Sequence, residues 1–194
     1  MFRPPFDAMN ISRKRTVRGS ALLELALVGT FIAIPLTLGT MTVGMTLART
    51  LRVYHVNRSA GHMFARGVDF SQPTGRALLV RMANGLNITD SGGTGVIMLS
   101  EIDCTNTGQA VCSRRLVIGN AGVRGSAFAS PTHIDSSGIV DYTHDPSATA
   151  TAFLKLMTMS PGDVAYVVET YVSSADYDWA GFLTGNGTYT YGVF

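Results

Sequence analysis

The chain carries little charge for its length. Of its 194 residues only 14% are Asp, Glu, Lys or Arg, whereas 46% are hydrophobic. The formal net charge of +2 is concentrated at the start, because residues 1–19 hold five basic side chains against Asp7. The remainder holds ten basic and twelve acidic side chains. The sequence therefore predicts no basic patch that would bind nucleic acid.

Motifs of the common catalytic and metal sites are also missing. Ser126 follows a glycine without the spacing of a nucleophile elbow. The glycine-rich stretch 92–95 precedes a predicted strand, whereas a phosphate-binding loop follows one. His and Asp side chains occur together in the polar segment 133–145, where such pairs are more often solvated than catalytic. We predict that the chain is not an enzyme and needs neither a cofactor nor a metal ion.

Cysteine is scarce as well. Cys104 and Cys112 are the two cysteines of the chain, and seven residues separate them. In an exported domain this spacing predicts a disulfide, which would contribute about 2.5 kcal/mol by closing a short loop. The alternative is two unrelated buried thiols. Zinc binding is a weaker interpretation, since the spacing matches no zinc pattern.

The most prominent feature of the sequence is one long apolar run, Ala21–Ala48, whose only charged residue is Glu24. As a helix this run would extend about 42 Å at about 1.5 Å per residue. The hydrocarbon core of a bilayer is about 30 Å thick, so the run predicts a transmembrane helix. A lone carboxylate in such a helix is costly, which makes Glu24 a candidate functional residue.

Several residues modify this predicted helix. Pro35 removes a backbone donor and is expected to kink it. The three glycines of the run would let other helices approach closely or would simply face lipid; they are Gly29, Gly39 and Gly44. From Thr46 to about Phe64 the pattern becomes amphipathic, which predicts that the helix continues and that the following domain packs on it.

The start of the apolar run carries a processing motif. Basic residues precede Gly19, Ser20 follows it, and Glu24 is the fifth residue after the glycine. This pattern resembles the processing site of type IV prepilins. Together with Pro35 and the later strand Tyr-Val-Val-Glu-Thr-Tyr-Val at 166–172, it resembles the TadE and TadF minor pseudopilins of tight-adherence pili.

The resemblance implies a bacterial inner-membrane protein with its C-terminal domain in the periplasm. A prepilin peptidase would cleave it between Gly19 and Ser20. The mature subunit would then join a pilus through other pilins and the assembly platform, with Glu24 pairing to an N-terminal amine. The resemblance leaves open whether the subunit is TadE-like or TadF-like, and whether it sits at the tip or along the shaft.

Two other interpretations of the N-terminus remain open. The helix would serve as a simple anchor for a periplasmic binding domain. Alternatively, the run would be a secretory signal peptide with Thr46–Ala48 as its cleavage site, releasing an enzyme. Against this, the run is longer than the usual apolar region of about 7 to 15 residues.

The remaining sequence predicts an α+β fold: one long N-terminal helix packed on a small, mainly antiparallel sheet, as in type IV pilins. We divide the chain into a leader (1–19), a transmembrane and assembly helix (20–50) and an exported domain (51–194). Strands are predicted at 96–102, 114–118, 164–172 and 188–194, short helices at 75–86 and 146–159, and mostly loop at 119–143. The uninterrupted apolar and aromatic pattern of 164–172 indicates a central strand.

Overall fold

The computed structural model describes residues 17–173 and 187–194, and the side chains of 17–20 are not among those described. Helix α1 (Val17–Ala65) is a single helix of 49 residues. The chain forms two compact units, Met1–Gly44 and Met45–Phe194. The basic leader predicted at 1–19 lies outside the described residues up to position 16.

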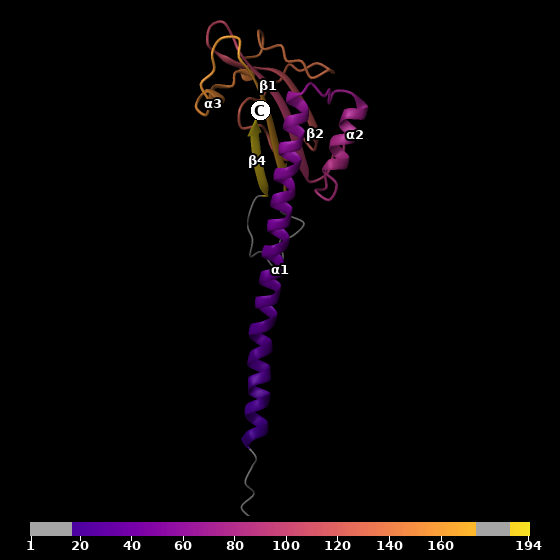
Figure 1. Ribbon diagram of the computed structural model, residues 1–194, viewed down its shortest axis with the longest axis vertical. Helices are drawn as coiled ribbons and strands as arrows, with labels where there is room; N and C mark the ends of the chain where they lie inside the picture. The colour runs from indigo at the N-terminus through magenta and orange to yellow at the C-terminus, as the bar shows by residue number, and fades with distance from the viewer. Residues whose placement is uncertain (1–16, 174–186) are drawn as a thin grey trace, which may run out of the picture. The chain divides into compact units, whose positions relative to one another are not determined.

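The second unit contains one antiparallel sheet of four strands (Figure 1). These are β1 (Gly95–Cys104), β2 (Ala110–Gly119), β3 (Val164–Val172) and β4 (Thr188–Val193). Their order in the sheet is β2-β1-β3-β4. The central position predicted for 164–172 is confirmed, because β3 pairs with β1 on one side and with β4 on the other. Val, Ile and Tyr are frequent in these strands, and such side chains pack well on a pleated surface.

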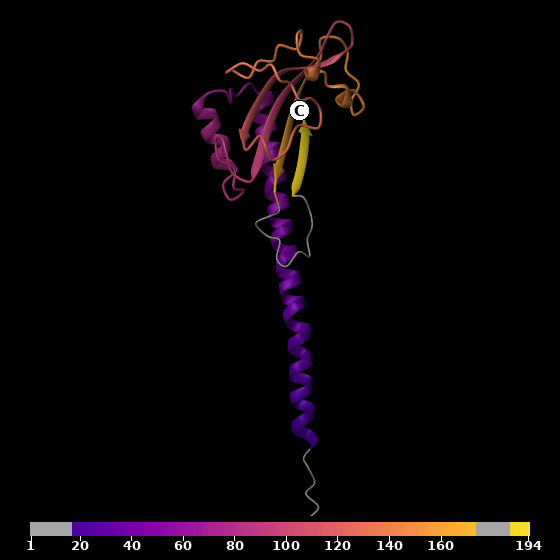
Figure 2. The ribbon, with the colours of Figure 1, turned by 180° about the vertical axis from the view of Figure 1, so that it is seen from behind.

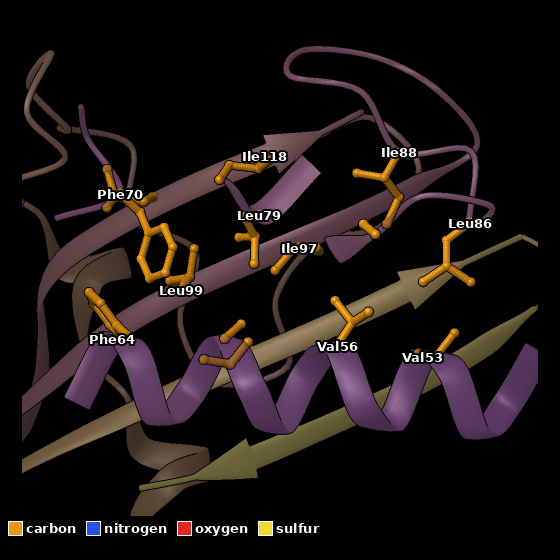
Figure 3. Close-up of a cluster of buried hydrophobic side chains, with 14 of the residues drawn as sticks. Val53, Val56, Phe64, Phe70, Leu79, Leu86, Ile88, Ile97, Leu99 and Ile118 are labelled. Atoms are coloured by element: carbon orange, nitrogen blue, oxygen red, sulfur yellow. The ribbon is translucent and has the colours of Figure 1, made fainter. Parts of the chain in front are cut away.

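One face of the sheet is covered by helices. Val53, Val56, Ala60 and Phe64 on the last part of α1 are buried against it. Helix α2 (Pro73–Met82) adds Leu79 to the same core. Figure 3 shows these side chains meeting those of the sheet, which are Ile97, Leu99 and Ile118. In Figure 2 the sheet lies in front of the C-terminal part of α1.

The other face is covered by the long connection between β2 and β3. It contains a 3-10 turn, η1 (Pro146–Ala148), and one helical turn, α3 (Thr151–Leu154). Phe128 and Phe153 pack edge to face there, with ring centroids 5.7 Å apart, and contribute to a second core with Val167 of β3. The pattern of β3 is therefore apolar on both faces because both faces are covered.

The predicted α+β class and all four strands are confirmed, and β3 has the predicted bounds. The predictions for the two short helices need correction. The segment 146–159 is not a single helix, because Thr149 is extended (φ −67°, ψ 124°) between η1 and α3. The first short helix begins at Pro73, a residue that favours the first helical turn, and ends at Met82 instead of 86. Gly85, with a positive φ that glycine adopts readily, lies in the turn that follows.

Candidate membrane and assembly helix

The motif residues of the N-terminus lie in the first turns of α1, which begins at Val17. Positions 20 and 24 are one helical turn apart and so share a face of the helix. The side chain of Glu24 is exposed. Gly19, Ser20 and Glu24 therefore stand where the apolar run begins, and cleavage between the first two remains a prediction.

The apolar side chains of this helix are uncovered. Leu22, Leu25 and Phe31 are 69%, 70% and 73% exposed, and the same holds for most large side chains up to Leu51. The helix is long and apolar enough to cross a membrane, and its apolar stretch is not buried. Soluble proteins rarely expose an apolar surface of this size, so lipid or protein is expected to cover it.

Several threonine hydroxyls on α1 donate hydrogen bonds within the helix itself. The hydroxyl of Thr30 donates to the carbonyl oxygen of Ala26 at 2.7 Å, and that of Thr37 donates to Ala33 at 2.8 Å. Thr42 and Thr50 make the same contact four residues back. Because lipid offers no alternative hydrogen-bond partner, this arrangement suits a membrane-spanning helix.

Small residues leave open positions along the run. A Cβ placed at Gly29, Gly39 or Gly44 would meet nothing within 4 Å. These positions are free for close approach by another helix, as the small-residue interpretation requires. The helix is continuous through Pro35, and the predicted kink stays a prediction.

The C-terminal part of α1 is fixed to the sheet by a polar contact as well as by apolar packing. Asn57 is buried, and its side-chain nitrogen donates to the backbone oxygen of Val168 at 2.9 Å and to the hydroxyl of Thr170 at 3.1 Å. A buried amide without partners would cost about 1 to 3 kcal/mol. The contact therefore fixes the position of α1 along β3.

A glycine makes a second close contact at the same interface. A Cβ at Gly61 would overlap the ring of Phe194. Phe194 also exchanges two backbone hydrogen bonds with Tyr166 of β3, at 2.9 and 3.1 Å. Its ring stacks edge to face on His62, with centroids 5.0 Å apart. The absence of a side chain at position 61 thus lets the end of the chain pack against α1.

The opposite face of the sheet holds a buried polar network that sequence reasoning missed. Glu169 is fully buried and accepts hydrogen bonds from the hydroxyls of Ser126 and Tyr189 and from the backbone N–H of Ala127. Arg115, also buried, lies 3.6 Å from the Glu169 carboxylate and donates to the carbonyl oxygen of Ala129 at 2.6 Å. The network thereby fastens the connection after β2 to the sheet.

Burial is the main cause of the pKa shifts of Arg115 and Tyr189 in this network. Desolvation lowers the pKa of Arg115, and the nearby Glu169 acts in the opposite direction. The pKa of Tyr189 is raised first by burial and then by its hydrogen bond to Glu169. Arg124 stacks over the Tyr189 ring, 4.2 Å from its centroid. The sequence offers one sign of this network, which is the single acidic residue in the largely apolar strand β3. Its partners come from three separate segments, so the sequence alone does not reveal them.

The predicted disulfide between Cys104 and Cys112 is wrong for this structure, in which both thiols are free and buried. The two residues lie on paired strands but not opposite one another, because Cys104 pairs with Ala110 and Cys112 pairs with Ile102. Diagonal neighbours of this kind are about 7 to 8 Å apart, which exceeds the usual span of a disulfide. Desolvation raises the pKa of the Cys112 thiol to about 11.

In the polar segment 133–145 the carboxylate of Asp145 holds the backbone in place through hydrogen bonds. Asp145 is buried and accepts hydrogen bonds from the Ser147 side chain and from the backbone N–H groups of His133, Thr132 and Ser147. These bonds, led by that of the Ser147 side chain, hold the pKa of Asp145 well below its usual range. Across the ranges 17–173 and 187–194, no three His, Cys, Asp or Glu side chains are grouped so as to hold a metal ion.

No family model, curated protein or solved structure matches the chain. The long apolar helix and the residues at its start are therefore the features that indicate a function.

Proposed function

We propose that the chain is a minor pilin-like subunit that joins a bacterial adhesive pilus of the tight-adherence type. The observation that carries the proposal is a Gly-Ser-x-x-x-Glu motif at the mouth of a long uncovered apolar helix, whose far part packs on an antiparallel sheet. This is the arrangement that the prepilin resemblance requires. The helix would hold the precursor in the inner membrane, with the sheet domain in the periplasm.

Processing would prepare the subunit for assembly. A prepilin peptidase would cut between Gly19 and Ser20, where glycine lets the backbone enter an active site without a clash from a Cβ. The uncovered apolar side chains of α1 would exchange lipid for the helices of neighbouring pilins as the subunit enters the pilus. The open positions at Gly29, Gly39 and Gly44 support such close packing.

Determination of the mature N-terminus tests the proposal. Intact-mass analysis of the chain from its native host, or from a host with a prepilin peptidase, is expected to give a species that begins at Ser20. A chain that retains Met1 would contradict processing and favour the anchored binding domain. A chain that begins at Arg49 would favour a secreted protein. A Gly19 substitution by a bulky residue is expected to leave uncleaved precursor.

A further inference from the structure

The stretch of chain after Glu24 has an unusual charge distribution. From Leu25 to Val68 the sequence has no Asp or Glu, yet it contains four arginines: Arg49, Arg52, Arg58 and Arg66. All four follow the apolar run. Anionic phospholipids attract basic residues that lie next to a membrane span. The part of the second unit that directly follows the predicted span is therefore the part where anionic lipid headgroups would bind.

Counting along α1 decides which arginines reach the lipid headgroups. A hydrocarbon core of about 30 Å that begins at Leu25 ends about 20 residues later, near Gly44. Arg52 then lies about 12 Å beyond the core, and its long side chain can extend back toward a headgroup layer about 5 to 7 Å thick. Arg66, about 33 Å beyond the core, is out of reach.

A second arginine joins Arg52 through the fold. The Nη1 atom of Arg52 lies 2.9 Å from the position that a Cβ at Gly85 would occupy. Gly85 and Arg81 both line a hollow of about 550 Å³, together with Asn84 and Thr89. The hollow has both polar and apolar walls. Arg81 lines it, and the guanidinium of Arg52, from a separate element, lies beside its lining residue Gly85.

Within the described ranges 17–173 and 187–194, neither guanidinium lies in an ion pair. Three other arginines have acidic partners among the described residues: Arg76 (Asp90, 2.5 Å), Arg114 (Asp69, 2.8 Å) and Arg115 (Glu169, 3.6 Å). Arg52 and Arg81 are exposed and form no ion pair with any residue of 17–173 or 187–194. A phosphate group offers the acceptor oxygens that guanidinium groups bind best.

We propose that Arg52 and Arg81 bind the phosphate of an anionic phospholipid headgroup at the hollow beside Gly85. Such binding would fix the depth of the domain at the membrane surface. The inference requires α1 to lie in a bilayer, but it does not require processing or pilus assembly. Failure of the lipid test would therefore leave the proposed function standing, and the reverse also holds.

Native mass spectrometry of the full chain in dodecyl maltoside tests the proposal, with phosphatidylglycerol and phosphatidylcholine added at equal concentration. We expect retention of phosphatidylglycerol at least tenfold above that of phosphatidylcholine. Arg52→Gln or Arg81→Gln is expected to reduce this preference about fivefold each. Arg52→Lys keeps the charge and is expected to retain most of it.

Arg66→Gln is the matched control, because it removes the same charge from an exposed arginine beyond headgroup reach. Equal retention of both lipids, or an equal loss in Arg66→Gln and Arg52→Gln, would overturn the proposal. Inorganic phosphate provides the other arm: if it protects residues 81–89 from hydrogen exchange as well as phosphatidylglycerol does, the hollow is a free-phosphate site and the lipid proposal is wrong. Equal unfolding midpoints of the variants show that the differences do not come from misfolding.

Discussion

The side-chain amide of Asn57 on α1 donates to the backbone oxygen of Val168 on β3 across 111 positions of sequence. This bond joins the helix that carries the candidate functional motif to the central strand of the sheet. Apolar side chains alone define the position of a helix along such a face weakly, since their packing is not directional. One buried amide with a fixed acceptor gives the interface a defined register.

We predict that Asn57→Ala destabilises the second unit by about 1 to 3 kcal/mol, because it removes a buried donor and leaves a cavity. Urea unfolding of the full chain in detergent, followed by circular dichroism, measures the loss. Arg58→Ala is the matched control, since its side chain is exposed. We expect this control to change stability by less than about 0.5 kcal/mol. Equal effects of the two substitutions would contradict the role given to Asn57.

We predict that Gly61→Ala displaces Phe194 from α1, because the added Cβ would overlap its ring. Overpacking of this kind costs about 1 to 3 kcal/mol, which exceeds the gain in helix propensity from alanine. Gly39→Ala has open space around it and is expected to be neutral or slightly stabilising. The unfolding midpoints of both variants test this, and a stabilised Gly61→Ala protein would show that Phe194 does not pack there.

Local patterns in the sequence were enough to predict the elements near these contacts. The β-branched and aromatic residues of 164–172 predicted β3 with its bounds, and the amphipathic pattern after Thr46 predicted that α1 continues onto the domain. The partners of Asn57 and Gly61 were not predictable, because strand pairing brings Val168 and Phe194 beside them from distant parts of the sequence. Both contacts depend on how the strands pair and on where α1 lies along the sheet, and no local sequence pattern specifies either.

The same reason explains the failure at the cysteines. Their sequence separation suited a hairpin disulfide, but the turn that joins β1 to β2 pairs Cys104 with Ala110. The same register places Cys112 opposite Ile102, two positions from Cys104. Likewise, Glu169 stood out as the acidic residue of β3, whereas nothing in the sequence marked its partners. The long apolar helix, in contrast, was predictable, because its length and composition can be read directly from the sequence.

We predict that Glu169→Gln destabilises the domain by about 3 kcal/mol or more, because it leaves the buried Arg115 without a counter-charge. Glu101→Gln is the matched control on β1. Burial, followed by the nearby Asp103, raises the pKa of Glu101, so its charged form is already unfavourable. We expect the control to be neutral or slightly stabilising. If the two variants unfold at the same urea concentration, the Arg115–Glu169 pair does not contribute as argued.

The raised pKa of Cys112 predicts a loss of stability in alkali. The folded thiol has a pKa of about 11, above the value of 9.0 that an unperturbed thiol has in the unfolded chain. Its contribution is therefore complete below pH 9 and is lost as the pH rises toward 11, by roughly 2 to 3 kcal/mol in total. Cys112→Ala is expected to flatten this part of the stability profile relative to the native chain, although its cavity lowers stability at every pH. Parallel profiles would contradict the prediction.

The state of the thiols gives a direct check on the same region. With both cysteines free and buried, the folded chain is expected to react slowly with iodoacetamide at mildly alkaline pH. Both thiols are expected to react after unfolding in urea without reductant. Mass spectrometry counts the alkylated sites. A chain that gains no label under denaturing, non-reducing conditions would restore the disulfide.

The last prediction concerns Glu24 and separates an assembly subunit from a simple anchor. Cleavage after Gly19 would create an α-amine on Ser20, which is largely cationic at neutral pH because the reference pKa of an α-amino group is about 8. In a pilus the amine of one subunit would meet the Glu24 carboxylate of its neighbour within an apolar environment. Loss of one partner would leave an uncompensated charge that costs several kcal/mol.

We therefore predict that Glu24→Ala still inserts into the membrane and is still cleaved, because a membrane helix tolerates alanine better than glutamate. We expect the variant to lose entry into the pilus. The measurement is the number of surface pili and the adhesion of cells that carry Glu24→Ala, compared with cells in which the whole gene is deleted. Glu24→Asp keeps the charge on a shorter side chain and is expected to restore part of the function. Thr30→Ala, which removes a polar group that is already satisfied within α1, is the control and is expected to assemble normally. Normal pili in Glu24→Ala cells, together with none in the deletion, would show that the carboxylate has no assembly role and would favour the anchored binding domain.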